Sequence, residues 1–186
     1  MKDGLDQKWW FDFKSGDDAM SEPWLRGTLT HVDAVRRQVL HSLELAAEDV
    51  ERWCAPLSDE ETEARPMGLP SVGFQLRHIA RSLDRLLTYA EGQQLSKRQL
   101  KALQTEMESE SREATFMEFS KAMEVSVDRI LAISPDSFEK ARGVGREMLQ
   151  STVGGLLVHC AEHTQRHVGQ AVTTAKVVVA VRGFGG

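Results

Sequence analysis

The sequence predicts an all-α protein: a four-helix bundle with a long connection between its second and third helices. Two observations carry this prediction. Apolar residues recur at spacings of three and four along four long segments, and prolines, glycines and capping residues separate those segments. The chain has 186 residues, 41% of them hydrophobic and 27% charged, which suits one globular domain with a proper core. We expect this domain to span residues 23–181, because helices of this kind bury their apolar stripes by packing together.

The first helix is expected from about Pro23 to Trp53. Pro23 is favourable in a first helical turn, and Pro56 lies just past the end. Residues 56–70 then form a connector rich in proline, glutamate and glycine. The apolar stripe of this first helix consists of Leu25, Thr28, Val32, Val35, Val39, Leu43, Ala46, Val50 and Trp53.

The second helix is expected from about Ser71 to Glu91. Ser71 is a suitable N-cap and Gly92 a suitable C-cap. Residues 93–115 form the long, mostly charged connection, which can act as a crossover between non-adjacent ends of the bundle. Within this connection a short amphipathic helix is indicated by Leu100, Leu103 and Met107.

A proline and a glycine-containing loop separate the third helix from the fourth. The third is expected from about Thr115 to Ile133, where Pro135 stops it. Residues 134–150 are expected to be a loop, and the fourth helix starts near Ser151 or Thr152 and continues to about Val179. The run 177–181 is mostly β-branched and could form a strand, but its stripe stays in helical phase, which favours helix.

The two ends of the chain are expected to lie outside the bundle. Residues 1–22 form an N-terminal arm whose aromatic residues need a covering surface, either on the bundle or on a second subunit. We favour a homodimer. Residues 182–186 form a frayed tail. The aromatic residues of the arm are Trp9, Trp10, Phe11 and Phe13.

Charge and composition exclude several classes of protein. The net charge is -5 and no basic patch is visible, so we expect no nucleic-acid partner. No apolar run approaches the ~20 residues of a membrane span, and the acidic start does not resemble a signal peptide. We therefore expect a cytoplasmic protein without membrane contact. Cys54 and Cys160 are too few for a disulfide framework and should be reduced thiols.

The stripe of the fourth helix contains two histidines. An isolated polar group buried without partners costs roughly 1–3 kcal/mol, and a shared metal ion would remove that cost for both imidazoles. His163 and His167 are four residues apart, so they lie on one helical face. On this reading the core-facing positions are Val153, Leu156, Cys160, His163, His167, Gln170, Thr174, Val177 and Val181.

A third ligand must come from another helix. His78 has the best position, in the middle of the second helix beside its apolar stripe. His31 and His41 lie off the stripe of the first helix, so we expect them at the surface. Three further residues could support the ligands or contact a substrate. These are His159, one turn before His163, the core thiol Cys160, and Gln170, one turn beyond His167.

Two motifs make the sequence resemble the DinB-like superfamily of metalloenzymes. The segment Gly155–Gln170 contains HxxxHxxxHVGQ, which is similar to the family's HxxxHRGQ ending. The segment Ser71–Ala80 begins SVGF and carries a histidine shortly after, like the family's second-helix motif. The resemblance spans roughly Trp24 to Val179. It departs at Val168, where many members have arginine, although Arg166 supplies a cation nearby.

The resemblance implies a four-helix bundle that holds one divalent metal ion through His78, His163 and His167. Imidazole ligands suit several metals, and we favour zinc or nickel, with iron or manganese as alternatives. Three protein ligands leave an open position, as in catalytic zinc sites. Relatives resemble transferases that use a low-molecular-weight thiol, which implies a thiolate attacking a small electrophile.

Three other interpretations remain open at this point. The protein could be a non-catalytic metal-binding stress or regulatory protein, a metal-dependent hydrolase, or a bundle whose histidines pair with buried polar groups and bind no metal. No side chain stands out as a general base. Glu162 and Arg166 flank the ligands in sequence, but their helical phase points them partly away from the seam, which suits supporting or surface roles.

Overall fold

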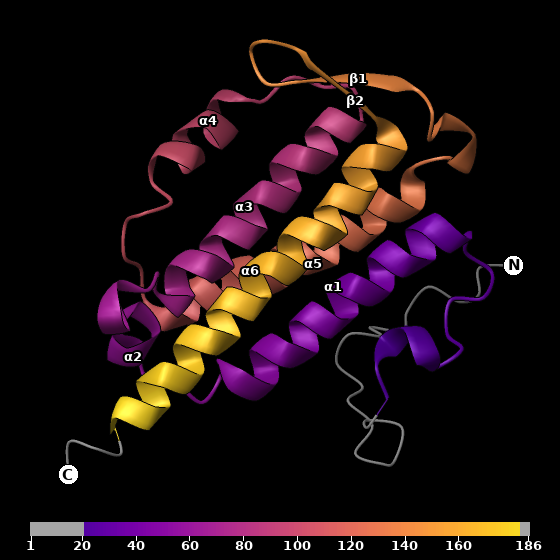
Figure 1. Cartoon of the computed structure of the whole chain (residues 1–186). Helices are drawn as coiled ribbons and strands as arrows, with labels where there is room; N and C mark the ends of the chain where they lie inside the picture. Colours follow the sequence, from indigo (N-terminus) through magenta and orange to yellow (C-terminus); the bar gives the residue numbers. More distant parts are fainter. Residues whose placement is uncertain (1–20, 183–186) are drawn as a thin grey trace, which may run out of the picture.

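The computed structural model describes residues 21–182 (Figure 1). This part of the chain is mostly helical, as predicted, with one small hairpin. In chain order its elements are η2 (Pro23–Leu25), α1 (Ala34–Trp53), α2 (Asp59–Glu63), η3 (Pro66–Gly68), α3 (Val72–Ala90), α4 (Lys97–Gln104), α5 (Arg112–Ala132), η4 (Pro135–Ser137), β1 (Ala141–Val144), β2 (Leu149–Thr152) and α6 (Val153–Arg182).

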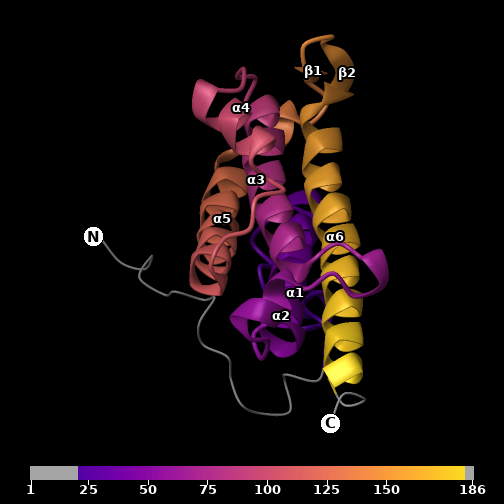
Figure 2. The same ribbon diagram turned by 90° about the vertical axis from the view of Figure 1, so that its left-hand side faces the viewer.

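The four long helices α1, α3, α5 and α6 form the bundle. Helix α6 packs most extensively on α3 and α1, while α5 packs on α3 and, to a lesser extent, on α1. Helices α3 and α5 run in the same direction, and the connection that carries α4 returns outside the bundle (Figures 1 and 2). The long connection is therefore a crossover, which places α3 between α5 and α6.

The first long helix starts later than the sequence predicts. Residues 23–33 do not continue α1, because Gly27 and Leu29 have φ values of 67° and 55°, which a right-handed helix cannot accommodate. Pro23 begins a single 3₁₀ turn instead. Helix α1 begins only after Asp33, whose carboxylate accepts a hydrogen bond of 3.1 Å from the Arg36 backbone N–H.

The remaining boundaries agree more closely. Ser71 caps α3 by accepting from the Phe74 N–H, as expected, and Gly92 adopts a φ of 80° just beyond the helix. Helix α5 begins at Arg112, before the predicted Thr115, because Ser111 caps it. Helix α2 was not predicted; its five residues follow a capping box in which Ser58 and Glu61 bond each other's backbone.

The predicted loop 134–150 contains an antiparallel hairpin. Ala141 pairs with Thr152 and Val144 with Leu149 across a turn at Gly145, whose φ is 73°. Helix α6 then continues to Arg182, so the strand alternative for residues 177–181 is wrong. Arg182 Nε donates to Glu61 Oε1 at 2.6 Å and ties this last turn to α2.

The structure also tests the expected burial of several single residues. His31 is exposed as predicted, but His41 is buried, with its Nε2 3.1 Å from Thr28 Oγ1. Burial, followed by the charges of Arg37 and Arg26, lowers the pKa of His41. The surface assignment of His41 is therefore wrong, because the segment before α1 folds back over it. Cys54 and Cys160 are buried free thiols, as expected.

The predicted N-terminal arm falls mainly on residues 1–20, and the predicted tail mainly on residues 183–186, which lie outside the described residues. The homodimer and the docking of the arm therefore stay predictions. None of the helices in residues 21–182 combines the length and hydropathy of a membrane span.

Candidate metal centre

Three histidines from two helices meet on one side of the bundle. His78 lies on α3, and His163 and His167 lie one turn apart on α6. One ring nitrogen from each lies within 4.8 Å of the others, the one such ligand group found among residues 21–182. The Nε2 atoms of His78 and His163 are 3.3 Å apart. A tetrahedral zinc ion with Zn–N bonds of about 2.0–2.1 Å would set its ligand nitrogens about 3.3 Å apart.

Hydrogen bonds at the far ring nitrogens define which atoms face the centre. His78 Nδ1 donates to Glu106 Oε2 at 2.9 Å, and His167 Nδ1 donates to Gln75 Oε1 at 2.7 Å. An ionised carboxylate only accepts, so the His78 proton is assigned to Nδ1. The Nε2 atoms of both histidines then present lone pairs to the centre, as metal-ligating histidines do when a carboxylate or carbonyl holds the other nitrogen. The residues present therefore fit a metal ion.

Helix α6 is rotated relative to the sequence interpretation. Four predicted positions, Val153, Leu156, Cys160 and Thr174, are buried, but the rest of the buried face lies one residue further along than the predicted stripe. His163 and His167 therefore lie at its edge and are only half-buried. The expectation that both imidazoles are buried in the core is therefore only partly correct. The rotation also opens the histidine cluster to solvent on one side. The buried residues of α6 are Val153, Leu156, Leu157, Cys160, Thr164, Val168, Ala171, Thr174, Ala175 and Val178.

The environment keeps the ligands of α6 neutral. Burial, followed by the neighbouring His167 and His78, lowers the pKa of His163 from 6.5 to about 4. Burial and the nearby His78 and Arg166 lower the pKa of His167 to about 4. Near neutral pH both rings are therefore unprotonated, which is the form that binds a metal.

Glu106 is a residue of the candidate site that the sequence did not predict. It is 7% exposed and accepts from Arg85 Nη1 at 2.5 Å as well as from His78. Burial alone would raise the pKa of its carboxyl, but the hydrogen bonds from His78 and Arg85 outweigh burial and hold that pKa below its usual value. No sequence pattern distinguishes it, because it is one of several acids in a charged connection.

Gln75 is the second residue that was missed. Its amide oxygen faces His167, and its amide nitrogen donates to Gln170 Oε1 at 2.9 Å. It lies one turn before His78 on α3, within the motif already singled out, so helical spacing alone could have identified it. Phe74, also in that motif, stacks on the His78 ring at a centroid distance of 5.6 Å.

The other candidate residues surround the cluster without joining it. His159 is partly exposed, and its ring lies 5.6 Å from that of His163. Cys160 is fully buried, and burial raises the pKa of its thiol to about 12. Gln170 is exposed and reaches His167 only through Gln75. Glu162 and Arg166 form an exposed ion pair of 2.6 Å.

The fold and the site together define a helical bundle with a three-histidine cluster between α3 and α6. A family model described as the DinB superfamily matches residues 42–171, which include all three histidines. The chain belongs to the DinB superfamily. Searches of curated proteins and of solved structures found no significant match.

Proposed function

We propose that the cluster binds one divalent metal ion and that the protein is a metal-dependent transferase, which joins a low-molecular-weight thiol to a small electrophile. The observation that supports metal binding is the convergence of the three histidines, two of them held at Nδ1 by acceptors of the protein. Family membership and the three-ligand count support the transfer reaction. Imidazole ligands suit zinc, nickel and iron, and we favour zinc or nickel, with iron or manganese as alternatives.

The three imidazoles would hold the ion, leaving one side open to solvent because His163 and His167 are only half-buried. When bound, such an ion lowers the pKa of a thiol or water on its open position. The chain's own groups position the ligands. Glu106 holds the His78 ring through Nδ1, and Gln75, oriented by Gln170, holds the His167 ring in the same way. A substrate would approach from the exposed side.

Metal analysis of the purified protein tests the first part. We expect close to one zinc or nickel ion per chain, lost in His163→Ala and retained in His31→Ala, which removes an exposed histidine elsewhere. Full occupancy in both His163→Ala and His167→Ala would contradict a site at this cluster.

The second part requires a spectroscopic test. In cobalt-substituted protein, binding of the thiol substrate at the open position should produce a sulfur-to-metal charge-transfer band. Gln170→Ala should keep the metal but lower the transfer rate, because Gln75 would lose the acceptor that orients it. Absence of the band with every common bacterial thiol, with cobalt bound, would contradict thiol transfer and favour a hydrolase or a non-catalytic metal-binding protein.

A further inference from the structure

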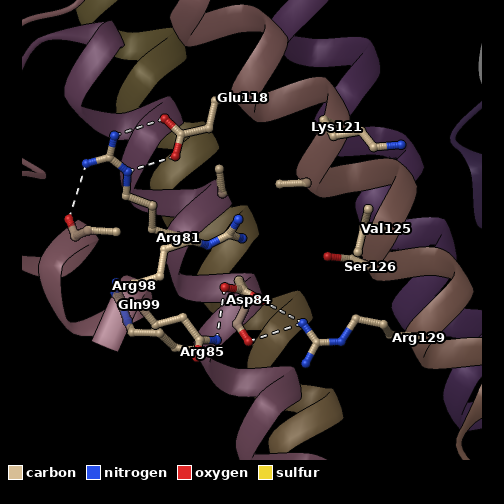
Figure 3. A pocket seen from close by; sticks show the side chains of 13 residues that line it. Arg81, Asp84, Arg85, Arg98, Gln99, Glu118, Lys121, Val125, Ser126 and Arg129 are labelled. Atoms are coloured by element: carbon tan, nitrogen blue, oxygen red, sulfur yellow. Dashed lines mark hydrogen bonds and ion pairs between the residues drawn. The ribbon is translucent and has the colours of Figure 1, made fainter. Parts of the chain in front are cut away.

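Helix α4 is attached to the bundle by polar groups rather than by an apolar core. Its apolar residues Leu100 and Leu103 are 39% and 46% exposed, and Met107, just beyond the helix, is 59% exposed. Helix α4 packs against α3, and a cavity of about 360 Å³ lies among α3, α4 and α5. Ion pairs of Arg81 with Glu118 and of Asp84 with Arg129 span α3 and α5 on this cavity (Figure 3). Few apolar contacts therefore hold the α4 segment in place.

The polar attachments of the segment all lead to α3. Gln99 Nε2 donates to Asp84 Oδ2 at 2.9 Å and to Thr88 Oγ1 at 2.8 Å. Arg81 donates to the Ala102 carbonyl at 3.2 Å. Arg81 also pairs with Glu110 at 3.1 Å. A further attachment is Glu106, whose contacts reach His78 and Arg85. One of the attachments of this segment is thus made to a candidate metal ligand.

Glu106 differs from its neighbours in burial. The structure describes every residue from 96 to 111, and Glu106 is the one that is buried. Burying a carboxylate is costly unless it is paired and hydrogen-bonded. Here both oxygens are used, one by His78 Nδ1 and one by Arg85 Nη1, and Arg85 Nη2 is itself held by Ser82 Oγ at 2.9 Å. The position of Glu106 is therefore tightly specified.

We propose that Glu106 is a positioning residue for His78 and that metal binding is coupled through it to docking of the segment 97–110. This inference rests on the proposed metal site. A carboxylate on Nδ1 fixes the tautomer and orientation of a ligating imidazole and increases its basicity. When the segment leaves α3, His78 loses that partner. Coupling is reciprocal, so a metal bound at His78 must stabilise the docked segment by the factor that docking adds to metal affinity.

The contact geometry requires a carboxylate at this position. A glutamine has one oxygen and one NH₂ group, so it can accept from His78 or from Arg85 but not from both. In Glu106→Gln, the amide NH₂ therefore faces an N–H group of His78 or of Arg85, and that hydrogen bond is lost. Glu110→Gln is a matched control, because Glu110 pairs with Arg81 at 3.1 Å in the same segment and does not contact His78.

The experiment measures zinc affinity and hydrogen exchange in the full-length protein and both variants. We expect Glu106→Gln to bind zinc about 10–100-fold more weakly, the usual effect of losing such a partner, and to change the visible spectrum of bound cobalt. Glu110→Gln should leave both unchanged. Zinc should slow amide exchange across residues 97–110 in the unmodified protein and in Glu110→Gln, but much less in Glu106→Gln.

The outcomes separate this inference from the proposed function. An unmodified protein that binds no zinc contradicts the metal site itself. Zinc bound equally well by Glu106→Gln overturns the positioning role. Zinc bound by the unmodified protein with no change in exchange across residues 97–110 overturns the coupling, and this measurement needs no variant, so it holds even if Glu106→Gln does not fold.

Discussion

Arg77 and His78 are neighbours on α3, yet they belong to two polar clusters of opposite character. Arg77 is fully buried and donates to Glu63 Oε1 at 2.5 Å and to Thr115 Oγ1 at 3.1 Å. Its guanidinium is thus paired by groups of the protein, although Nε has no partner among the described residues. His78 instead faces two other imidazoles at the edge of the bundle.

The difference between the clusters is whether the chain satisfies them. Around Arg77, a cation meets an anion, and α2, α3 and α5 are joined by the contact. Around His78, three imidazole rings bring ring nitrogens together, and no acid lies between them. A cluster of the first kind stabilises the fold, whereas one of the second kind is completed by a ligand from outside. The following changes test this contrast, starting with the largest expected effect.

Removing the partner of Arg77 should cause the largest loss of stability. Glu63→Ala leaves a buried guanidinium without its carboxylate, which costs about 3–5 kcal/mol when a buried pair is broken. Chemical denaturation measures the loss, and zinc affinity should not change. Glu60→Ala, an exposed acid in the same short helix, is the control and should have little effect. Equal stability of the two variants would mean that the Arg77 cluster does not hold the fold.

Metal removal tests the other cluster. Zinc that binds only the folded state should stabilise the protein by about 2.7 kcal/mol at a free concentration 100 times its Kd. Chelation should lower the melting temperature accordingly, and calorimetry with and without chelator measures the shift. The same chelator should not affect His163→Ala. If the chelator does not change the melting temperature of the zinc-loaded protein, the histidine cluster does not differ from the Arg77 cluster in needing a ligand from outside.

Two glycines offer a matched pair near the clusters. A Cβ at Gly73 would lie 2.2 Å from Glu63 Oε1, so Gly73→Ala should push Glu63 away from Arg77 and destabilise the protein by about 1–3 kcal/mol. A Cβ at Gly169, two residues after His167, meets nothing within 4 Å. Gly169→Ala should therefore stabilise α6 by up to about 1 kcal/mol. Urea unfolding measures the free energy of unfolding of both variants, and we expect changes of opposite sign.

The last test concerns how the stability of the metal-free protein depends on pH. His163 and His167 have pKa values of about 4 when folded, against an ordinary value of 6.5, so the unfolded chain binds more protons between these values. Stability of the metal-free protein should then fall as the pH drops from about 6.5 towards 4. Urea unfolding across this range, compared with a His163→Gln/His167→Gln variant, isolates the contribution. Parallel curves for the two proteins would contradict the lowered pKa values.

The sequence predicted the features that depend on local periodicity. The four long helices follow from apolar spacing, and the pairing of His163 with His167 follows from one helical turn. The start of α1 could not be predicted, because it depends on the positive φ values at Gly27 and Leu29. The hairpin was missed because each strand has only four residues and neither shows strict alternation of apolar and polar residues.

The sequence predicted the three histidines of the candidate site, but not Glu106 and Gln75, which contact two of them. Glu106 reaches His78 across 28 positions of the chain, through a docked segment whose position no local pattern determines. The rotation of α6 was misjudged in part. A second apolar set, one residue out of phase with the predicted stripe, includes Leu157, Val168 and Ala175 and is buried alongside part of that stripe. Which of two adjacent stripes faces the core is decided by the neighbouring helices.

The sequence separations within the two clusters also set the order in which they can form during synthesis. Glu63 lies 14 residues before Arg77 and emerges from the ribosome first, and Thr115 lies 38 residues after Arg77 and emerges soon afterwards. His78 contacts His163 across 85 residues, so its cluster can close only when α6 has been made as far as His167. Domains generally fold as units from the N-terminal side during translation, and distant contacts form slowly. Uptake of the proposed metal ion would therefore have to follow the synthesis of His167, long after the Arg77 cluster can form.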